Sequence, residues 1–236
     1  MKRKAWLTWS SGKDSAWALE TIRRQGEVDV VALLTTVNTT HGRVAMHAVR
    51  EALVQRQAES LGLPLVVVPL PWPCPNAAYE EAMAQAVARA RDQGVTHMVF
   101  GDLFLEDVRR YREEKLAGSG IQPLFPLWGG ETSKLAHEMV AGGLRAYITC
   151  VDPRMLDRDF AGRFFDESLL ASLPASADPC GENGEFHTFC FAGPMFEKPI
   201  PVMAGETVER DGFVFADLLP VPLNTARDGV SMTKQK

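Results

Sequence analysis

Residues 10–15 of the chain read Ser10-Ser11-Gly12-Lys13-Asp14-Ser15 and lie between two apolar segments of different periodicity. Residues 5–9, before them, form a short apolar run that predicts a buried strand. Residues 16–22, after them, have the apolar spacing of a helix. The hexapeptide is therefore predicted to turn from a first strand into a first helix. Its small residues let a bound group approach the backbone, and the amino end of a helix attracts an anion.

The side chains of this turn suit a phosphate chain. Lys13 adds a positive charge, and the three serine residues add hydroxyl donors. The stretch is not a Walker A loop, because Asp14 follows the lysine and the upstream glycine of that motif is missing. A carboxylate beside a phosphate is repulsive unless a cation lies between them, so Asp14 indicates magnesium. The alternative is an ordinary Ser/Gly-rich turn in which Lys13 and Asp14 are solvated.

Length and composition restrict the class of protein. The 236 residues are 46% hydrophobic and carry a formal net charge of −5, so nucleic acid is not an expected partner. No apolar run is long enough to span a bilayer. The four cysteines form no C-x-x-C pair, which argues against a zinc site or a redox pair. We expect a cytoplasmic protein with reduced thiols.

Strands and helices alternate along the first 151 residues. The strands are predicted at residues 5–9, 28–37, 65–70, 96–100 and 145–151. The helices are predicted at residues 16–22, 44–61, 76–93 (capped by Asn76), 106–116 and 133–140, with an extended connection at 123–128. This order predicts an α/β fold with an open five-stranded parallel sheet and helices on both faces. Ligands bind at the carboxyl edge of such a sheet, where the hexapeptide, the loop after Thr35 and Gly101-Asp102 should converge.

The pattern changes after Val151. Short helices are expected at residues 157–165 and 167–173, followed by short alternating runs and a frayed polar tail from about Asn224. We therefore expect a phosphate-binding sheet domain at residues 1–151 and a small α+β lobe at residues 152–236.

A second stretch of chemical interest reads Gly181-Glu182-Asn183-Gly184-Glu185-Phe186-His187-Thr188. Its glycine pair favours a loop shaped for close approach. Glu182 and Glu185 are suited to bind an amine, to act as a base or to ligate a metal. His187 has an ordinary pKa near neutrality, which suits proton transfer. The alternatives are a solvated turn for the glutamates and a structural, hydrogen-bonded role for the histidine.

Both stretches resemble a known family. Residues 10–15 are similar to Ser-Gly-Gly-Lys-Asp-Ser, the signature of the PP-loop ATP pyrophosphatases, except that Ser11 replaces the first glycine. That replacement matters if the position needs a positive φ angle. Residues 181–188 resemble the Gly-Glu-x-Gly-Glu-Phe/Tyr-His-Thr stretch of the diphthine–ammonia ligase-like branch. Further similar segments lie in the expected order, namely Gly101-Asp102, Pro126-Leu127-Trp128 and Gly193-Pro194-Met195-Phe196. The chain departs from the branch in lacking Tyr-Gln before Arg109.

The resemblance implies a fold of the adenine nucleotide α-hydrolase (HUP-like) class and an ATP-dependent ligase. Such an enzyme uses ATP and Mg²⁺ to adenylate a carboxylate, releases pyrophosphate, and lets ammonia or an amine displace AMP. The carboxylate belongs to an acceptor such as a modified residue of a translation elongation factor, and a homodimer is left open. A non-catalytic ATP- or AMP-binding regulatory module on the same fold is the alternative. A sulfur-transferring tRNA modifier is disfavoured by the scattered cysteines and the acidic balance.

The resemblance and the residue chemistry together assign roles. Nucleotide binding is expected from Ser10, Ser11, Gly12, Lys13, Ser15, Thr35, Gly101 and Asp102, and metal binding from Asp14 and Asp102. Catalytic roles are expected for Lys13, Asp14, Glu182, Glu185 and His187, and substrate binding for Arg109, Glu113, Gly184 and Thr188. His41 and His47 flank the second loop and would line a pocket, although a surface position is favoured for His41.

Overall fold

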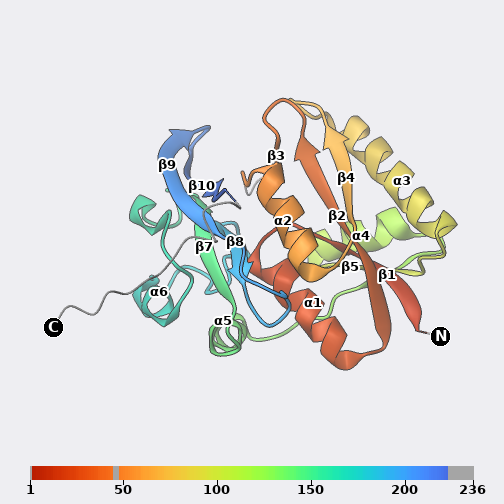
Figure 1. The fold of residues 1–236 in the computed structure, drawn as a ribbon, viewed down its shortest axis with the longest axis horizontal. Coiled ribbons are helices and arrows are strands. Elements are labelled where there is room, and N and C mark those ends of the chain that lie inside the picture. The colour runs from red at the N-terminus through yellow and green to blue at the C-terminus, as the bar shows by residue number, and fades with distance from the viewer. Residues whose placement is uncertain (1, 45–47, 223–236) are drawn as a thin grey trace.

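The computed structural model describes residues 2–44 and 48–222 and contains two sheets, which lie side by side in Figure 1. The strands of the first sheet are β1 (Arg3–Thr8), β2 (Val28–Asn38), β3 (Arg43–Val44), β4 (Leu65–Leu70), β5 (His97–Val99) and β6 (Gln122–Leu124). Those of the second are β7 (Arg145–Val151), β8 (Phe186–Ala192), β9 (Val202–Arg210) and β10 (Phe213–Pro220). The α-helices are α1 (Lys13–Gln25), α2 (Glu51–Leu61), α3 (Asn76–Asp92), α4 (Glu106–Leu116), α5 (Thr132–Ala141) and α6 (Glu167–Ser172), with a 3₁₀ turn at Arg158–Phe160.

The first sheet is the predicted open parallel sheet. Five strands pair in parallel in the order β4-β2-β1-β5-β6, and the short β3 adds an antiparallel pair at the end of β2. The chain moves outward from β1 first toward β2 and later toward β5, so the strand order reverses beside β1. This reversal creates a crevice at the carboxyl ends of the strands, where ligands bind in sheets of this kind.

The side chains of β1 show how the sheet is covered on both faces. Ala5 and Leu7 belong to the core that includes the apolar faces of α1 and α2. Trp6, between them, belongs to a second core with residues of α3 and α4. Successive side chains of a strand point to opposite faces, so a strand buried on both faces reads as a continuous apolar run.

The fifth parallel strand is not the one predicted. Residues 145–151, expected in that place, form β7, which pairs antiparallel with β8 and β10 in the second sheet. The place is taken by β6, a three-residue strand that overlaps the start of the predicted extended connection at residues 123–128. A short strand that contains Pro123 gives almost no strand signal. The predicted domain boundary after Val151 stays a prediction, but the change from one sheet to the other comes earlier, between β6 and β7.

Three helix starts also differ from the prediction. Helix α1 begins at Lys13, inside the stretch predicted as a turn. Helix α2 begins at Glu51 instead of residue 44, because Val44 pairs with Val37 in the hairpin of β2 and β3. Pro75 occupies the capping position of α3, so Asn76 is its first helical residue. The predicted roles of His47 and of the tail from Asn224 fall outside the described residues.

The two sheets share one core. The apolar cluster that contains Leu7 and Trp17 continues through Ile148 of β7 and Phe189 of β8. Figure 1 accordingly shows β8 beside α1. None of the helices in the described part of the chain combines the length and apolar character needed to cross a membrane.

Candidate active site

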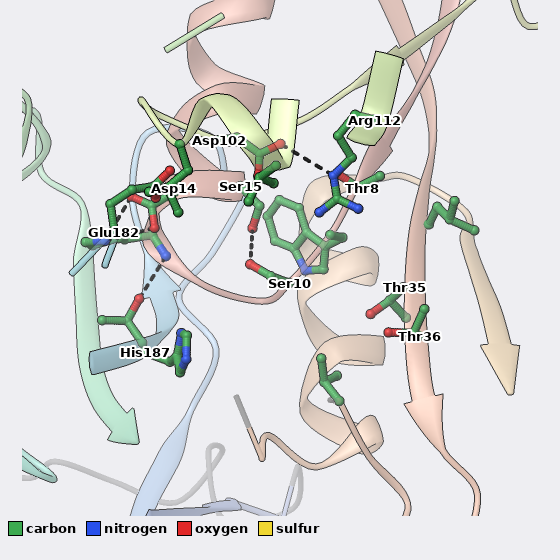
Figure 2. Close-up of a pocket in the computed structure, with 18 of the residues that line it drawn as sticks. Thr8, Ser10, Asp14, Ser15, Thr35, Thr36, Asp102, Arg112, Glu182 and His187 are labelled. Atoms are coloured by element: carbon green, nitrogen blue, oxygen red, sulfur yellow. Dashed lines mark hydrogen bonds and ion pairs between the residues drawn. The ribbon is translucent and has the colours of Figure 1, made fainter. Parts of the chain in front are cut away.

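A cavity of about 460 Å³ opens at the carboxyl edge of the first sheet, where the second sheet adjoins it (Figure 2). One part of its wall comes from the strand ends and from the turn before α1, and another from the loop before β8. Helices α3 and α4 supply further wall residues. The lining residues that carry polar or charged groups are Thr8, Ser10, Lys13, Asp14, Ser15, Thr35, Thr36, Tyr79, Asp102, Arg112, Glu182, His187 and Thr188.

The turn at residues 10–15 has an unusual backbone conformation at Ser11. Its φ angle is +73°, a left-handed conformation that glycine adopts without cost and serine does not. Ser11 is completely buried, and its hydroxyl has no hydrogen-bond partner within the described residues. Its carbonyl oxygen accepts hydrogen bonds from the Cys190 amide at 2.9 Å and from the Gln57 side chain at 3.0 Å. The turn is thus held from behind by β8 and α2, and Ser11 faces the core instead of the cavity.

Gln57 is a positioning residue that the sequence analysis did not identify. Its buried amide nitrogen donates to the carbonyl oxygens of both Ser11 and Cys190, at 3.0 Å and 2.6 Å. Its amide oxygen accepts from the Trp9 indole at 2.8 Å. The signal available in the sequence was its spacing, because Gln57 lies four residues from both Leu53 and Leu61 on the apolar face of the helix, where an amide requires partners.

Gly101 is needed because the backbone of the turn passes against it. A Cβ atom at this position would lie 3.0 Å from the backbone carbon of Asp14 and 3.0 Å from the nitrogen of Ser15. The end of β5 therefore packs directly on the first turn of α1. Asp102 follows immediately, and both residues line the cavity as expected.

Lys13 lies at the junction of the turn and the acidic loop. Its ammonium contacts both carboxylate oxygens of Asp14 at 2.8 Å and donates to the carbonyl oxygen of Cys180. It also lies 5.5 Å from the ring centroids of Phe165 and Phe186, and the residue is only 2% exposed. Burial disfavours the ammonium, but the Asp14 carboxylate outweighs this and raises the pKa of Lys13. Burial also raises the pKa of Asp14. We take the pair as ionised because the carboxylate meets the ammonium through both oxygens.

The backbone of Lys13 also connects the turn at residues 10–15 to the stretch at residues 181–188. Its N–H donates to the hydroxyl of Thr188 on β8 at 3.0 Å. Two segments that are 175 positions apart in sequence therefore touch at the start of α1. Thr188, expected to bind substrate, lines the cavity and also anchors the turn.

Glu185 holds the acidic loop in shape. Its buried carboxylate accepts hydrogen bonds from the amide of Asp178 at 2.8 Å and from the amide and side chain of Asn183, both at 3.1 Å. It does not line the cavity. Asp178, which the sequence analysis did not single out, accepts from the amides of Cys180 and Glu182 at 3.1 Å and 2.9 Å. Two carboxylates thus fold the loop, and the catalytic role predicted for Glu185 has no support in its position.

Glu182 is the glutamate of the loop that lines the cavity. Its carboxylate accepts a hydrogen bond from the Leu103 amide at 2.7 Å, which ties the loop to the segment after β5. Burial, reinforced by the nearby Asp14 and Asp102 carboxylates, raises the pKa of Glu182 to about 7. A carboxyl group with such a pKa exchanges a proton readily at neutral pH.

His187 also lines the cavity, beside Thr188 on β8. Burial and the neighbouring Lys13 ammonium lower the pKa of His187 to about 4. The imidazole is therefore neutral at pH 7, so in the predicted proton transfer it could accept a proton or donate a hydrogen bond but would not act as a charged acid.

The remaining predicted residues separate into two groups. Thr35 lines the cavity from within β2, whereas Gly12, Gly184, Arg109 and Glu113 do not line it. Gly184 has a φ angle of +93° and serves the loop turn. Arg109 pairs with Glu113 at 2.8 Å on the exposed side of α4 and lies over the rings of Phe125 and Trp128. His41 is exposed, as favoured from the sequence.

A family model described as the diphthamide synthase N-terminal domain matches residues 2–123, and one described as the diphthamide synthase C-terminal domain matches residues 131–216. The chain belongs to the diphthamide synthase family. The resemblance noted from residues 10–15 and 181–188 is therefore confirmed.

Relatives named diphthine–ammonia ligase resemble this family member over different lengths. The zebrafish (Danio rerio) protein is 28% identical over 228 residues, which cover 88% of this chain and 89% of the relative. The bovine (Bos taurus) and human (Homo sapiens) proteins are 33% and 32% identical over 118 residues, which cover 48% of this chain and 44% of each relative. The chain thus matches less than half the length of the two mammalian relatives.

Within the family fold, α4 contributes a cavity residue that the sequence analysis missed. Leu105, Val108 and Arg112 line the cavity, and they follow the i, i+3, i+7 spacing of one helix face. Arg109 and Glu113 belong to the neighbouring face. This spacing was visible in the sequence and would have selected Arg112 instead of Arg109.

The carboxylates of the cavity are suited to magnesium that enters with a phosphate ligand. Within residues 2–44 and 48–222, the His, Cys, Asp and Glu side chains form no group of three or more placed to hold a metal ion. Mg²⁺ bound with nucleotides commonly uses one or two carboxylates, with phosphates and water as the other ligands. Asp14 and Asp102 line the same cavity, and one buried oxygen of Asp102 has no hydrogen bond. This donor set fits such an ion.

Proposed function

We propose that the chain is an ATP-dependent carbon–nitrogen ligase of the diphthine–ammonia ligase type. The reaction proposed is adenylation of a carboxylate with release of pyrophosphate, followed by attack of ammonia or an amine with release of AMP. The names of its relatives support this reaction class.

One structural observation carries the proposal. The turn at residues 10–15 and the acidic stretch at residues 181–188 border one cavity. The Lys13 N–H of the turn donates a hydrogen bond to the Thr188 hydroxyl at the end of that stretch, so the two are in direct contact. A site that only senses a nucleotide needs the turn. A ligase also needs an acidic group beside the phosphates to manage the protons of an attacking amine.

The first proposed step joins the carboxylate to the nucleotide. A carboxylate oxygen attacks the α-phosphorus of ATP, and the bond from that phosphorus to the bridging oxygen of pyrophosphate breaks. The hydroxyls of Ser10 and Ser15, 3.2 Å apart in the cavity wall, are placed to donate to phosphate oxygens. The Lys13 N–H is taken by Thr188, but the amino end of α1 still points its positive dipole toward the same negative charge.

Magnesium held by Asp14 and Asp102 would neutralise charge on the departing pyrophosphate. Lys13 keeps Asp14 in place and fixes the acidic loop through Cys180. The role proposed for Lys13 is therefore to position these groups, instead of the direct phosphate contact expected from the sequence.

The second proposed step forms the amide. The nitrogen of ammonia attacks the acyl carbon, AMP leaves with the bonding electrons of the acyl–oxygen bond, and a proton is lost from nitrogen. Glu182 is the proposed acceptor of that proton, because it lines the cavity and has a pKa raised to about 7. Its hydrogen bond to Leu103 fixes the carboxylate while leaving its other oxygen available.

Product analysis tests the proposal. The protein is incubated with ATP, Mg²⁺, ammonium and a panel of carboxylates, and the nucleotides are separated. AMP and pyrophosphate are expected in equal amounts, and Glu182→Gln should reduce their formation by about 10²-fold or more. The matched control is Glu138→Gln, which changes an exposed glutamate on α5. Formation of ADP and phosphate would overturn the adenylation mechanism, and ATP binding without any AMP would favour the regulatory module.

A further inference from the structure

The charged groups that line the cavity are unevenly matched. Among the described residues, three carboxylates line it, those of Asp14, Asp102 and Glu182, against the two cations Lys13 and Arg112. The Lys13 ammonium is committed to Asp14 and Cys180 and is almost completely buried. A triphosphate would bring further negative charge into the same space, so a protein cation with open donors would strengthen its binding, in addition to any magnesium that enters with the phosphates.

Arg112 is the cation that remains open toward the cavity. Within the described residues, its one polar contact is 3.5 Å from its Nε to an oxygen of Asp102, too long for a good hydrogen bond. Its guanidinium carbon lies 5.0 Å from the ring centroid of Phe100. Figure 2 shows the guanidinium beside Asp102 and turned into the cavity. The ring and the ion pair fix the orientation of the group, and its terminal N–H donors have no protein acceptor among these residues.

Other arginines of α4 show that this arrangement is specific to one position. Arg109 is paired with Glu113 outside the cavity, and Arg110 is exposed. Arg112 differs from both in lining the cavity and in lacking a short carboxylate contact. A guanidinium presents paired N–H donors that match two oxygens of a phosphate group.

We propose that Arg112 is a nucleotide-binding residue that contacts a phosphate group of ATP from the α4 wall of the cavity. The proposal rests on the proposed function, because it takes ATP as the ligand. It adds a phosphate contact from a part of the chain outside the turn at residues 10–15. Arg112 would thereby favour nucleotides that carry a phosphate chain over nucleosides.

Calorimetric binding with EDTA present separates phosphate recognition from recognition of the nucleoside. The probes are adenosine, AMP, ATP and inorganic pyrophosphate, and the variants are Arg112→Gln, Arg112→Lys and the control Arg110→Gln. Arg112→Gln should weaken ATP and pyrophosphate binding at least tenfold and change adenosine binding less than twofold. Arg112→Lys should recover part of the loss because it keeps the charge, and Arg110→Gln should match the original protein.

Two results would overturn the proposal. Unchanged ATP and pyrophosphate affinity in Arg112→Gln would exclude a phosphate contact. An equal loss of ATP and adenosine affinity would show that Arg112 only supports the shape of the cavity. Both results leave the ligase proposal standing, because that proposal is decided by whether AMP or ADP is formed.

Discussion

Substitution of Ser11 tests whether backbone strain and a buried hydroxyl destabilise the turn at residues 10–15. The residue is completely buried, has a φ angle of +73°, and has a hydroxyl without a partner in the described structure. Ser11→Gly removes both unfavourable features. Ser11→Ala removes the hydroxyl but keeps a Cβ atom in the left-handed conformation.

The expected gain follows from three contributions. A left-handed backbone costs a residue with a side chain about 1–2 kcal/mol. A buried hydroxyl without a hydrogen bond costs about 1–3 kcal/mol. Glycine loses about 0.5–1 kcal/mol through the greater freedom of its unfolded chain. We therefore expect Ser11→Gly to raise the free energy of unfolding by about 1–4 kcal/mol, and Ser11→Ala, which relieves only the hydroxyl cost, by about 1–3 kcal/mol.

Urea unfolding followed by tryptophan fluorescence measures these differences, with equal m-values as a condition for comparison. For a chain of this length, each kcal/mol should also shift the melting temperature by about 2–4 °C. Asp211→Gly is the control, since Asp211 has a φ angle of +52° at an exposed site where aspartate is well tolerated. Stability of Ser11→Gly below that of Ser11→Ala would refute the argument from backbone strain.

Three further predictions concern the contacts around the cavity. Gly101→Ala should lower the free energy of unfolding by about 1–3 kcal/mol and weaken ATP binding, because the added Cβ would lie 3.0 Å from backbone atoms of Asp14 and Ser15. Urea unfolding and calorimetry measure the two effects. The control Gly130→Ala should change neither, because its nearest atom is 3.5 Å away. Burial would raise the pKa of Asp217, but hydrogen bonds from Arg43 and Arg50 lower it to about 2. The ionised carboxylate therefore stabilises the fold above pH 3.8, and this stabilisation is lost as the pH falls toward 2. Asp217→Asn should cost about 2 kcal/mol of unfolding free energy at pH 7, and urea titrations near pH 2 should show almost no difference. The pKa of Glu182 is raised from 4.5 to about 7, so the folded state keeps a proton that the unfolded state loses, and stability falls as the pH rises through this window. Glu182→Gln with EDTA should therefore match the original protein at pH 4.5 and be about 3 kcal/mol more stable at pH 8. Equal stability at pH 8 would contradict the raised pKa.

Local sequence was sufficient to predict the core of this fold. The run at residues 28–37 is apolar on both faces and indicates a strand covered by helices on both sides, as β2 proved to be. Residues 106–116 were predicted as a helix and form α4. Strand partners were harder to predict, because pairing depends on contacts far apart in sequence. For this reason the sequence wrongly places residues 145–151 in the parallel sheet and gives no strand signal for β6.

The same division applies to the site. The sequence by itself determined where the two chemical stretches lie, because each groups glycine with charged side chains next to an apolar run. Only the tertiary structure decided that Glu182 enters the cavity while Glu185 holds the loop, and that Lys13 is bound to Asp14 and Cys180. The direction of a side chain depends on which distant backbone groups satisfy its hydrogen bonds, and one stretch of sequence does not contain those partners.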